Sequence, residues 1–429
     1  MEIKNFLKLI SITVILVFLW WLKEISFSHN NIIFMENWKI FLVFLVFLLF
    51  LIILTLMIED NFDVYLLYLL VLIGSLIIIC CDHLLIIYLG LELQTFSLFV
   101  LIAKNKSSIK GSEAGLKYFI LGAISSGLYL LGLCFLFLFG ISLNLKLLMI
   151  NLDNSLVILS LTLILLSFGF KLGLSPFHFW LPDIYEGSSW DVISLISSIP
   201  KLSVLSIFIQ IIINSNLILF VSLISIIIGT LGALNQTKLK RLLAYSSISH
   251  MGFIVLGYSL LNLIGYEISF IYLFIYMITS ISLFIIILKT PLLKDYYIIE
   301  LSGLQYINKT LSLTWLIIFL SIAGIPPLSG FISKWFILWN TITSNFIFSS
   351  IIIILFSMIG AAYYLRVVKI VYFQKQASYL TWTKVLNYKH KKENYNSFFL
   401  GWVIFFSIFF ILNPDPFLVY INYILFYFF

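Results

Sequence analysis

The 429-residue chain is 62% hydrophobic and only 10% charged, and its formal net charge is +7. A water-facing surface needs far more charge, so this composition excludes a soluble globular protein. The apolar segments run for about 20 residues without polar alternation, which excludes a transmembrane barrel. The sequence therefore predicts an all-α polytopic membrane protein, whose basic residues set topology rather than bind nucleic acid.

About thirteen apolar runs are long enough to cross a membrane as helices. In chain order the expected spans are Phe6–Leu22, Ile40–Ile58, Val64–Cys80, Leu84–Ala103, Leu116–Phe139, Leu156–Leu181, Val192–Ile213, Leu217–Leu234, Leu242–Leu261, Ile268–Leu288, Leu311–Asn340, Ile347–Phe373 and Phe398–Leu412. No small-residue cleavage site follows the first run, so we interpret it as a retained helix rather than a signal peptide. The short apolar tail after Pro416 is expected at the membrane interface or packed on the bundle.

The loop charges indicate the orientation of the chain. When the loops are followed in order, one side collects most of the basic residues: Lys4, Lys8, Lys104, Lys106, Lys110, Lys238, Lys240, Arg241, Lys289, Lys294, Lys309, Lys375, Lys384, Lys389, Lys391 and Lys392. The other side holds little beyond Lys23, Lys39 and Lys146. Positive loops stay on the side of synthesis, so the N-terminus is predicted to face the matrix or cytoplasm and the C-terminus to face outward.

Two expected helices are interrupted. The sixth contains Pro176, and the eleventh contains the segment Ala323-Gly-Ile-Pro-Pro-Leu-Ser-Gly330. Non-helical backbone at membrane depth is tolerated only inside protein or beside water. Interrupted helices at matching positions of two inverted halves are typical of a substrate or ion path. Lys171 precedes the first break, whereas Lys334 follows the second.

A carboxylate and several lysines lie within the apolar runs. A charged residue at the centre of a spanning helix costs about 2.5–3.5 kcal/mol, and such residues usually mark proton or ion paths. Glu92 lies in the fourth run, and Lys171 is its natural partner. A structural ion pair is the alternative interpretation. Because a lysine's charge depends on its partner, a carboxylate that approaches and retreats would let Lys171 load and release a proton.

For the other ionisable residues the sequence gives weaker evidence of a role in proton transfer. Lys201 follows Pro200, which suggests irregular backbone, although the lysine could also snorkel to the interface. Lys117 begins the fifth helix, where snorkelling is as good an explanation as function. His178 and His250 fit a proton relay because histidine titrates near neutral pH, but each could be a satisfied core residue. Solvated or interfacial roles are expected at helix ends for Lys23, Asp82, His83 and Lys146.

The sequence lacks the motifs of redox and nucleotide chemistry. It contains neither a GxGxxG fingerprint in a βα unit nor a P-loop. Cys80, Cys81 and Cys134 form no CxxC pair, so we expect packing residues rather than disulfides, a metal site or an iron–sulfur site. No soluble segment exceeds a loop, so the chain by itself cannot bind and oxidise a nicotinamide cofactor.

Several strings resemble one family: Leu89-Gly-Leu-Glu-Leu-Gln, Ser112-Glu-Ala-Gly-Leu-Lys-Tyr-Phe-Ile-Leu-Gly-Ala, Gly169-Phe-Lys-Leu-Gly-Leu-Ser-Pro-Phe-His-Phe-Trp-Leu-Pro-Asp and Gln236-Thr-Lys-Leu-Lys-Arg-Leu-Leu-Ala-Tyr-Ser-Ser-Ile-Ser-His. They resemble the subunit 2 family of respiratory NADH:ubiquinone oxidoreductase (complex I), one of its three antiporter-like subunits. The resemblance runs from about Leu84 to Phe417. Many members have fourteen helices and carry the counterpart of Glu92 on the fifth, so one N-terminal helix is missing here.

The resemblance implies two inverted five-helix repeats with two discontinuous helices. The expected divisions are 1–82 for the first helices, 83–213 and 214–375 for the repeats, 376–396 for a basic matrix-side loop and 397–429 for the last helix and tail. It also implies that protons move along a hydrated axis when quinone reduction elsewhere shifts the glutamate–lysine pair. The implied proton-path residues are Glu92, Lys117, Lys171, His178, Lys201, His250 and Lys334.

The resemblance further implies the setting of the protein. No cofactor is expected in this chain, and partner subunits would bind FMN, iron–sulfur clusters and ubiquinone. Expected partners are the other membrane-arm subunits of complex I, including the other two antiporter-like subunits, and lipids such as cardiolipin. Residues with A/T-rich codons indicate an organelle-encoded protein of the mitochondrial inner membrane. The alternatives are a subunit of a non-redox cation/proton antiporter complex and a structural scaffold.

Overall fold

The computed structural model describes residues 36–57, 61–104, 108–138, 140–145, 155–211, 215–290, 297–374, 394–410 and 412–426. Within these ranges the elements are helices, and β-type backbone pairing is limited to two isolated bridges, His83 with Asn144 and Lys238 with Tyr297. Eight described helices are long and apolar enough to cross a membrane, and three shorter apolar helices accompany them. The prediction of an all-helical polytopic membrane protein is confirmed. The expected first span, Phe6–Leu22, and most of the basic loop 376–396 lie outside the described residues.

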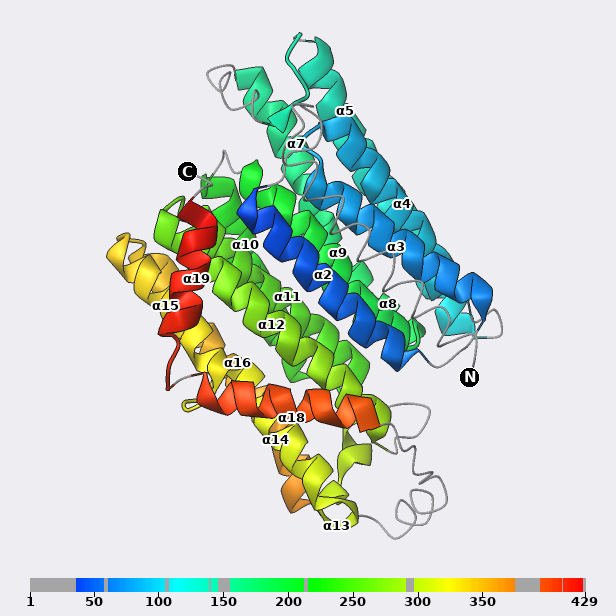
Figure 1. Cartoon of the computed structure of the whole chain (residues 1–429), viewed down its shortest axis with the longest axis vertical. Helices are drawn as coiled ribbons and strands as arrows, with labels where there is room; N and C mark the ends of the chain where they lie inside the picture. Colours follow the sequence, from blue (N-terminus) through cyan, green and yellow to red (C-terminus); the bar gives the residue numbers. More distant parts are fainter. Residues whose placement is uncertain are drawn as a thin grey trace. The chain divides into compact units, whose positions relative to one another are not determined.

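The helices fall into two compact units (Figure 1). Unit 1 comprises residues 1–173, 186–214 and 422–429. Its described helices are α2 (Asn37–Leu56), α3 (Phe62–Cys80), α4 (Leu84–Ile102), α5 (Ile109–Leu138), α7 (Ser155–Leu172) and α9 (Trp190–Gln210). Every residue of α9 from Trp190 to Ile209 is buried. Both α2 and α3 pack on α9, so these N-terminal helices help to bury it.

Unit 2 comprises residues 174–185 and 215–421. Its helices are most of α8 (Trp180–Gly187), α10 (Ser215–Leu234), α11 (Leu239–Ser259), α12 (Leu263–Lys289), η2 (Ile298–Leu301), α13 (Leu304–Ile307), α14 (Lys309–Ala323), α15 (Ser329–Thr343), α16 (Ile347–Phe373), α18 (Asn394–Phe409) and most of α19 (Asp415–Phe426). Figure 1 shows α10, α11 and α12 side by side. The apolar tail forms α19 and packs on the bundle, because Phe417 contacts Phe274 with ring centroids 4.6 Å apart.

Both predicted interruptions are present. The expected span Leu156–Leu181 divides into α7 and α8, with a non-helical segment from Gly173 to Phe179. The expected span Leu311–Asn340 divides into α14 and α15. Each first half ends at a glycine in the left-handed region, Gly173 at φ 73° and Gly324 at φ 77°, where a Cβ would add strain.

Pro200 does not interrupt α9, contrary to the expectation of irregular backbone there. The helix runs through it from Trp190 to Gln210, with Pro200 in its interior. A membrane helix tolerates proline where neighbouring helices and Ser or Thr side chains satisfy the freed backbone groups. The N–H that Pro200 lacks would have bonded to the Ile196 carbonyl, and α2, α3, α4 and α7 pack on α9 around this segment. Lys201 therefore lies on a continuous helix.

The second interruption depends on a close contact between its two halves. A Cβ added to Gly330 on α15 would collide with the Ser321 carbonyl oxygen on α14, and that oxygen belongs to backbone that cannot rotate away. We expect Gly330→Ala to push α15 from α14 and to destabilise the protein by about 1–3 kcal/mol or more, as overpacking does. The measurement is the yield and thermal stability of the assembled membrane protein. Gly127→Ala is the matched control, because a Cβ there meets no atom within 4 Å, and equal losses in both variants would contradict the contact.

Candidate functional site

Glu92 lies on α4 among polar side chains of unit 1. Thr95, one turn later, donates from its hydroxyl to the Glu92 Oε2 atom at 3.2 Å. Tyr88 also hydrogen-bonds to Glu92, and the carboxylate interacts electrostatically with Lys171. The two residues that the sequence paired are thus within electrostatic range of each other. A lysine partner lowers the cost of keeping this half-buried carboxylate charged.

Lys171 belongs to the last turn of α7, immediately before the interruption. Its Nζ lies 5.9 Å from the centroid of the Phe170 ring, and the side chain is half-buried. The C-terminal end of a helix carries partial negative charge, so a cation is favoured in the last turn. The helix end and Glu92 therefore both stabilise charge on Lys171.

Lys201 is 1% exposed on α9. A hydrogen bond near it joins two helices, since Gln94 Nε2 on α4 donates to Ser203 Oγ at 3.1 Å. Gln94 follows Glu92 by two residues, and Ser203 follows Lys201 by two. Sequence reasoning missed Gln94, although a buried amide in an apolar run was a signal. This bond fixes the helix that carries the carboxylate against the helix that carries Lys201.

His250 lies in a cluster of tyrosines in unit 2, which we call the tyrosine cluster: Tyr272 and Tyr276 of α12 and Tyr363 and Tyr364 of α16. His250 Nδ1 is 2.8 Å from the Tyr272 hydroxyl, and Nε2 is 3.1 Å from the Tyr364 hydroxyl. The Tyr276 ring stacks on the imidazole at a centroid separation of 5.2 Å. Both ring nitrogens thus have hydroxyl partners that can each donate or accept a proton.

The tyrosine cluster was missed by sequence reasoning. Tyr272 and Tyr276 are four residues apart and so share one face of α12, while Tyr363 and Tyr364 adjoin on α16. That spacing was a signal, but tyrosine in an apolar run is also an ordinary packing residue. The three-dimensional structure distinguishes the two interpretations by aiming hydroxyl groups at His250.

Lys334 lies on α15 and reaches back to the end of α14. Its Nζ donates to the carbonyl oxygens of Ala323 at 2.8 Å and Ile322 at 3.2 Å. These carbonyls lack intrahelical partners because α14 ends at Ala323. The interruption therefore creates a binding site for an ammonium group, reinforced by the negative end of the helix dipole.

His178 lies in the non-helical segment before α8 and is 5% exposed. Its ring contacts Phe179 at a centroid separation of 4.4 Å, and it hydrogen-bonds with the backbone of Pro176. His178 falls in unit 2, whereas Lys171 falls in unit 1. Its participation in a proton path stays a prediction.

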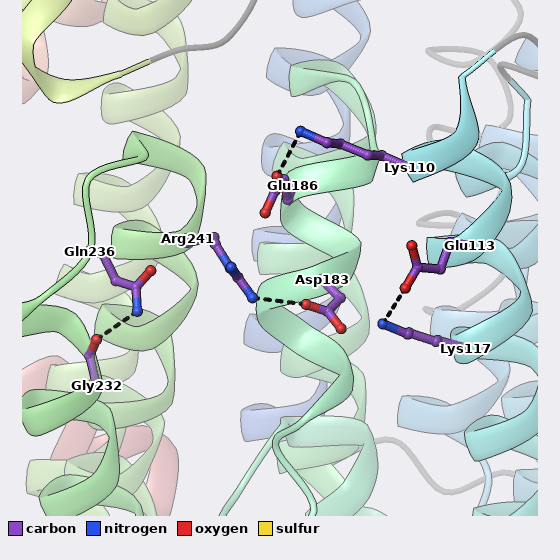
Figure 2. A network of polar contacts seen from close by, with 8 residues as sticks. All are labelled: Lys110, Glu113, Lys117, Asp183, Glu186, Gly232, Gln236 and Arg241. Carbon is purple, nitrogen blue, oxygen red and sulfur yellow. Dashed lines mark hydrogen bonds and ion pairs between the residues drawn. The ribbon is translucent and has the colours of Figure 1, made fainter.

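Lys117 forms an ion pair with Glu113 at 2.6 Å, one turn earlier on α5 (Figure 2). The two side chains are 40% and 57% exposed, and such exposed i,i+4 pairs contribute about 0.3–0.5 kcal/mol. This geometry matches a surface salt bridge, and a role for Lys117 in proton transfer stays a prediction.

Two basic residues that the sequence assigned to topology also form ion pairs with α8 (Figure 2). In unit 2, Arg241 of α11 pairs with Asp183 at 3.1 Å. In unit 1, Lys110 of α5 pairs with Glu186 at 3.0 Å. The boundary between the units falls between Tyr185 and Glu186, within the same helix. Each unit thus has its own ion pair to a part of α8.

Lys39 and Asp82 differ most from the sequence expectation. The sequence placed Lys39 among the loop charges and predicted a solvated or interfacial role for Asp82, but the structure buries this pair, with Lys39 0% and Asp82 3% exposed. Lys39 Nζ bonds to Asp82 Oδ1 in unit 1. The helix ends meet inside protein rather than at its surface, which the linear sequence does not reveal.

The described residues contain no group of three or more His, Cys, Asp or Glu side chains that could hold a metal ion. Cys80 and Cys81 are buried, Cys134 is exposed, and all three are free thiols. What the site does offer is titratable side chains at helix interruptions and hydroxyl groups beside a buried histidine. Such an arrangement can bind and pass protons.

The chain is similar to known proteins over most of its length. The family model described as "NADH:quinone oxidoreductase/Mrp antiporter, TM" matches residues 81–360. The NADH-ubiquinone oxidoreductase chain 2 of Metridium senile is 39% identical over 81% of this chain and 92% of its own length. The NADH-quinone oxidoreductase subunit N of Pelagibacter ubique is 37% identical over 71% of this chain and 68% of its own.

Solved structures agree with the sequence relatives. A chain of respiratory complex I from Thermus thermophilus has a TM-score of 0.83 and 25% identity, and the match covers 97% of this chain and 93% of that one. A chain of the Mrp complex from Dietzia sp. has a TM-score of 0.86 at 17% identity, covering 99% and 92%, a likeness of fold alone. The match of the family model and the identity to the chain 2 and subunit N proteins place this chain in the NADH:quinone oxidoreductase/Mrp antiporter transmembrane family.

Proposed function

We propose that this chain is the subunit 2 component of the membrane arm of respiratory complex I and that it translocates protons. NADH oxidation and ubiquinone reduction take place in other subunits of the complex. The observation that carries the proposal is the electrostatic pair of Glu92 and Lys171 next to the interruption of α7. A change in the charge or position of Glu92 alters how strongly Lys171 holds a proton, which links a distant reaction to proton loading.

The two units support a common design. Lys171 lies in the last turn of α7, and Lys334 reaches from α15 to the last carbonyls of α14, so each lysine adjoins the C-terminal end of a first half-helix. The order of lysine and break along the sequence differs, but the physical arrangement is shared. This likeness favours two inverted five-helix repeats, at 83–213 and 214–375, within a chain of about thirteen spans.

We assign proton transfer to Glu92, Lys117, Lys171, His178, Lys201, His250 and Lys334, and we add Tyr272 and Tyr364 as hydroxyl partners of His250. Lys201 is buried on α9, the helix on which α2 and α3 pack. Lys117 has the least structural support because its pair with Glu113 is exposed.

The setting follows from the same assignment. Partner subunits hold FMN, iron–sulfur clusters and ubiquinone, and the neighbours include the two other antiporter-like subunits and lipids such as cardiolipin. The relative from Metridium senile is an NADH-ubiquinone oxidoreductase chain, which favours the mitochondrial inner membrane, with the N-terminus in the matrix. A non-redox antiporter complex shares the fold, and co-purification with iron–sulfur subunits distinguishes the two.

Replacing the deep lysines tests the active role. We expect Lys171→Met and Lys201→Met, in an assembled complex, to lower proton pumping and coupled ubiquinone reduction by about tenfold or more, because a positioned proton carrier is lost. The measurement is acidification per NADH oxidised in sealed membrane vesicles. Lys309→Met is the matched control, since Lys309 is exposed at the start of α14. Unchanged pumping in both the Lys171→Met and Lys201→Met variants would contradict a role in proton transfer and favour a purely structural scaffold.

Removing single hydroxyl groups tests the tyrosine cluster. Tyr272→Phe and Tyr364→Phe each remove one hydrogen-bond partner of His250 while keeping the ring. A lost buried hydrogen bond costs about 1–3 kcal/mol, so we expect pumping to slow several-fold with assembly retained. Tyr258→Phe is the control, because Tyr258 is equally buried in unit 2 but its ring packs against Tyr266 and Phe270 rather than against His250. If all three variants slow pumping alike, the hydroxyls of the cluster have no specific role.

A further inference from the structure

Helix α2 carries a single ionisable residue. Its twenty residues are apolar apart from Asn37, Lys39 and Thr55. Between helices in lipid, apolar contact provides no hydrophobic driving force, because lipid tails are as apolar as leucine. A uniformly apolar helix therefore has little to fix its rotation or its height in the membrane, and Lys39 is the group that can do so.

The partner of Lys39 is rigidly held. Asp82 lies between α3 and α4 and is 3% exposed, while Lys39 is 0% exposed. The Asp82 carbonyl oxygen accepts a hydrogen bond from Leu145 N at 2.9 Å, and Leu84 N donates to Leu143 O at 3.0 Å. Asp82 thus lies where the end of α3 and the start of α4 bond to the segment that follows α5, and its carboxylate is an anchor for α2.

What α2 covers is the helix that carries Lys201. Along one side α2 buries Leu42, Val46, Phe50 and Ile53, each at most 1% exposed. It packs on α9, as does α3, and leaves Lys201 1% exposed. A shift of α2 would open the covered face of α9 to water. The burial of α9, the helix that carries Lys201, therefore depends in part on where α2 is held.

We propose that the Lys39–Asp82 pair positions α2 across α9 and so closes the end of unit 1 at which α2 begins, sealing Lys201 against passive proton entry. This inference rests on the proposed function of Lys201. The pair itself carries no proton in the transport cycle. The residues of the family model begin at 81, so Lys39 is a contribution of the N-terminal helices to the translocating part of the chain.

The physics of a buried pair provides the test. Removing one partner leaves the other charge buried without compensation, which is strongly destabilising, whereas replacing both with apolar residues of similar size is often neutral. A pair that only positions α2 can therefore be replaced by an apolar pair. A pair that transfers protons cannot.

The first experiment compares Asp82→Asn with the double variant Lys39→Met/Asp82→Leu in the assembled complex. We expect Asp82→Asn to raise passive proton leak several-fold in sealed vesicles whose NADH oxidation is inhibited, and to lower pumping per NADH. We expect the double variant to restore low leak and normal pumping. If Asp82→Asn prevents assembly while the double variant assembles and pumps, the same conclusion holds, because the unpaired charge is what displaces α2.

Two neighbouring thiols report water access independently of pumping. Cys80 and Cys81 precede Asp82 and are 5% and 7% exposed. In a Cys134→Ser background, which removes the exposed thiol, we expect a membrane-impermeant maleimide to label Cys80 and Cys81 faster in Asp82→Asn than in the double variant or the parent. Labelling is read by mass spectrometry of the peptide that contains both cysteines.

Three outcomes overturn the inference. They are a parent-like leak and labelling in an assembled Asp82→Asn complex, a double variant that fails to assemble, and a double variant with low leak that does not pump. The last result would make the pair part of proton transfer. The Lys201→Met variant tests the proposed function separately. If it leaves pumping unchanged, Lys201 carries no protons, and this result does not depend on the Lys39–Asp82 pair.

Discussion

The constraint on which this protein depends is that charged side chains and unbonded backbone groups must satisfy one another away from water. An interrupted helix leaves carbonyl oxygens without partners, and a lysine in lipid needs negative charge nearby. Lys334 and the last carbonyls of α14 meet both needs at once. Lys171 occupies the last turn of α7 beside Glu92. The C-terminal end of a half-helix therefore helps to stabilise the charge of each lysine. Gly173 and Gly324, both in the left-handed region, end these two half-helices.

Much of this was predictable from the sequence. Long apolar runs mark most of the spans, and proline and glycine mark both interruptions, because they act through local backbone geometry. The pairing of Glu92 with Lys171 followed from the cost of isolated charge in lipid. Sequence reasoning was wrong at Pro200, where it expected irregular backbone. The helix nevertheless continues through Pro200, with α2, α3, α4 and α7 packed on it.

Partners that are distant in sequence were not predictable. Lys39 and Asp82 are 43 residues apart, Gln94 and Ser203 are 109 apart, and His250 and Tyr364 are 114 apart. Which side chains meet depends on how helices rotate and cross, and an apolar run gives little information about rotation when nearly all its residues are hydrophobic. The ion pair of Lys117 with Glu113 is the opposite case, since the i,i+4 spacing is visible in the sequence.

The serines of α9 allow a buried helix to take part in a reaction that needs water molecules. Ser194, Ser197 and Ser206 each donate to a carbonyl three residues earlier in their own helix. Those carbonyls also take part in the helix, so each hydroxyl is satisfied without any other helix or water molecule. Rotation about a single side-chain bond turns such a hydroxyl toward an arriving water molecule, and the backbone does not have to move. The helix that carries Lys201 therefore carries serine hydroxyl groups that can switch reversibly between a carbonyl of their own helix and a water molecule.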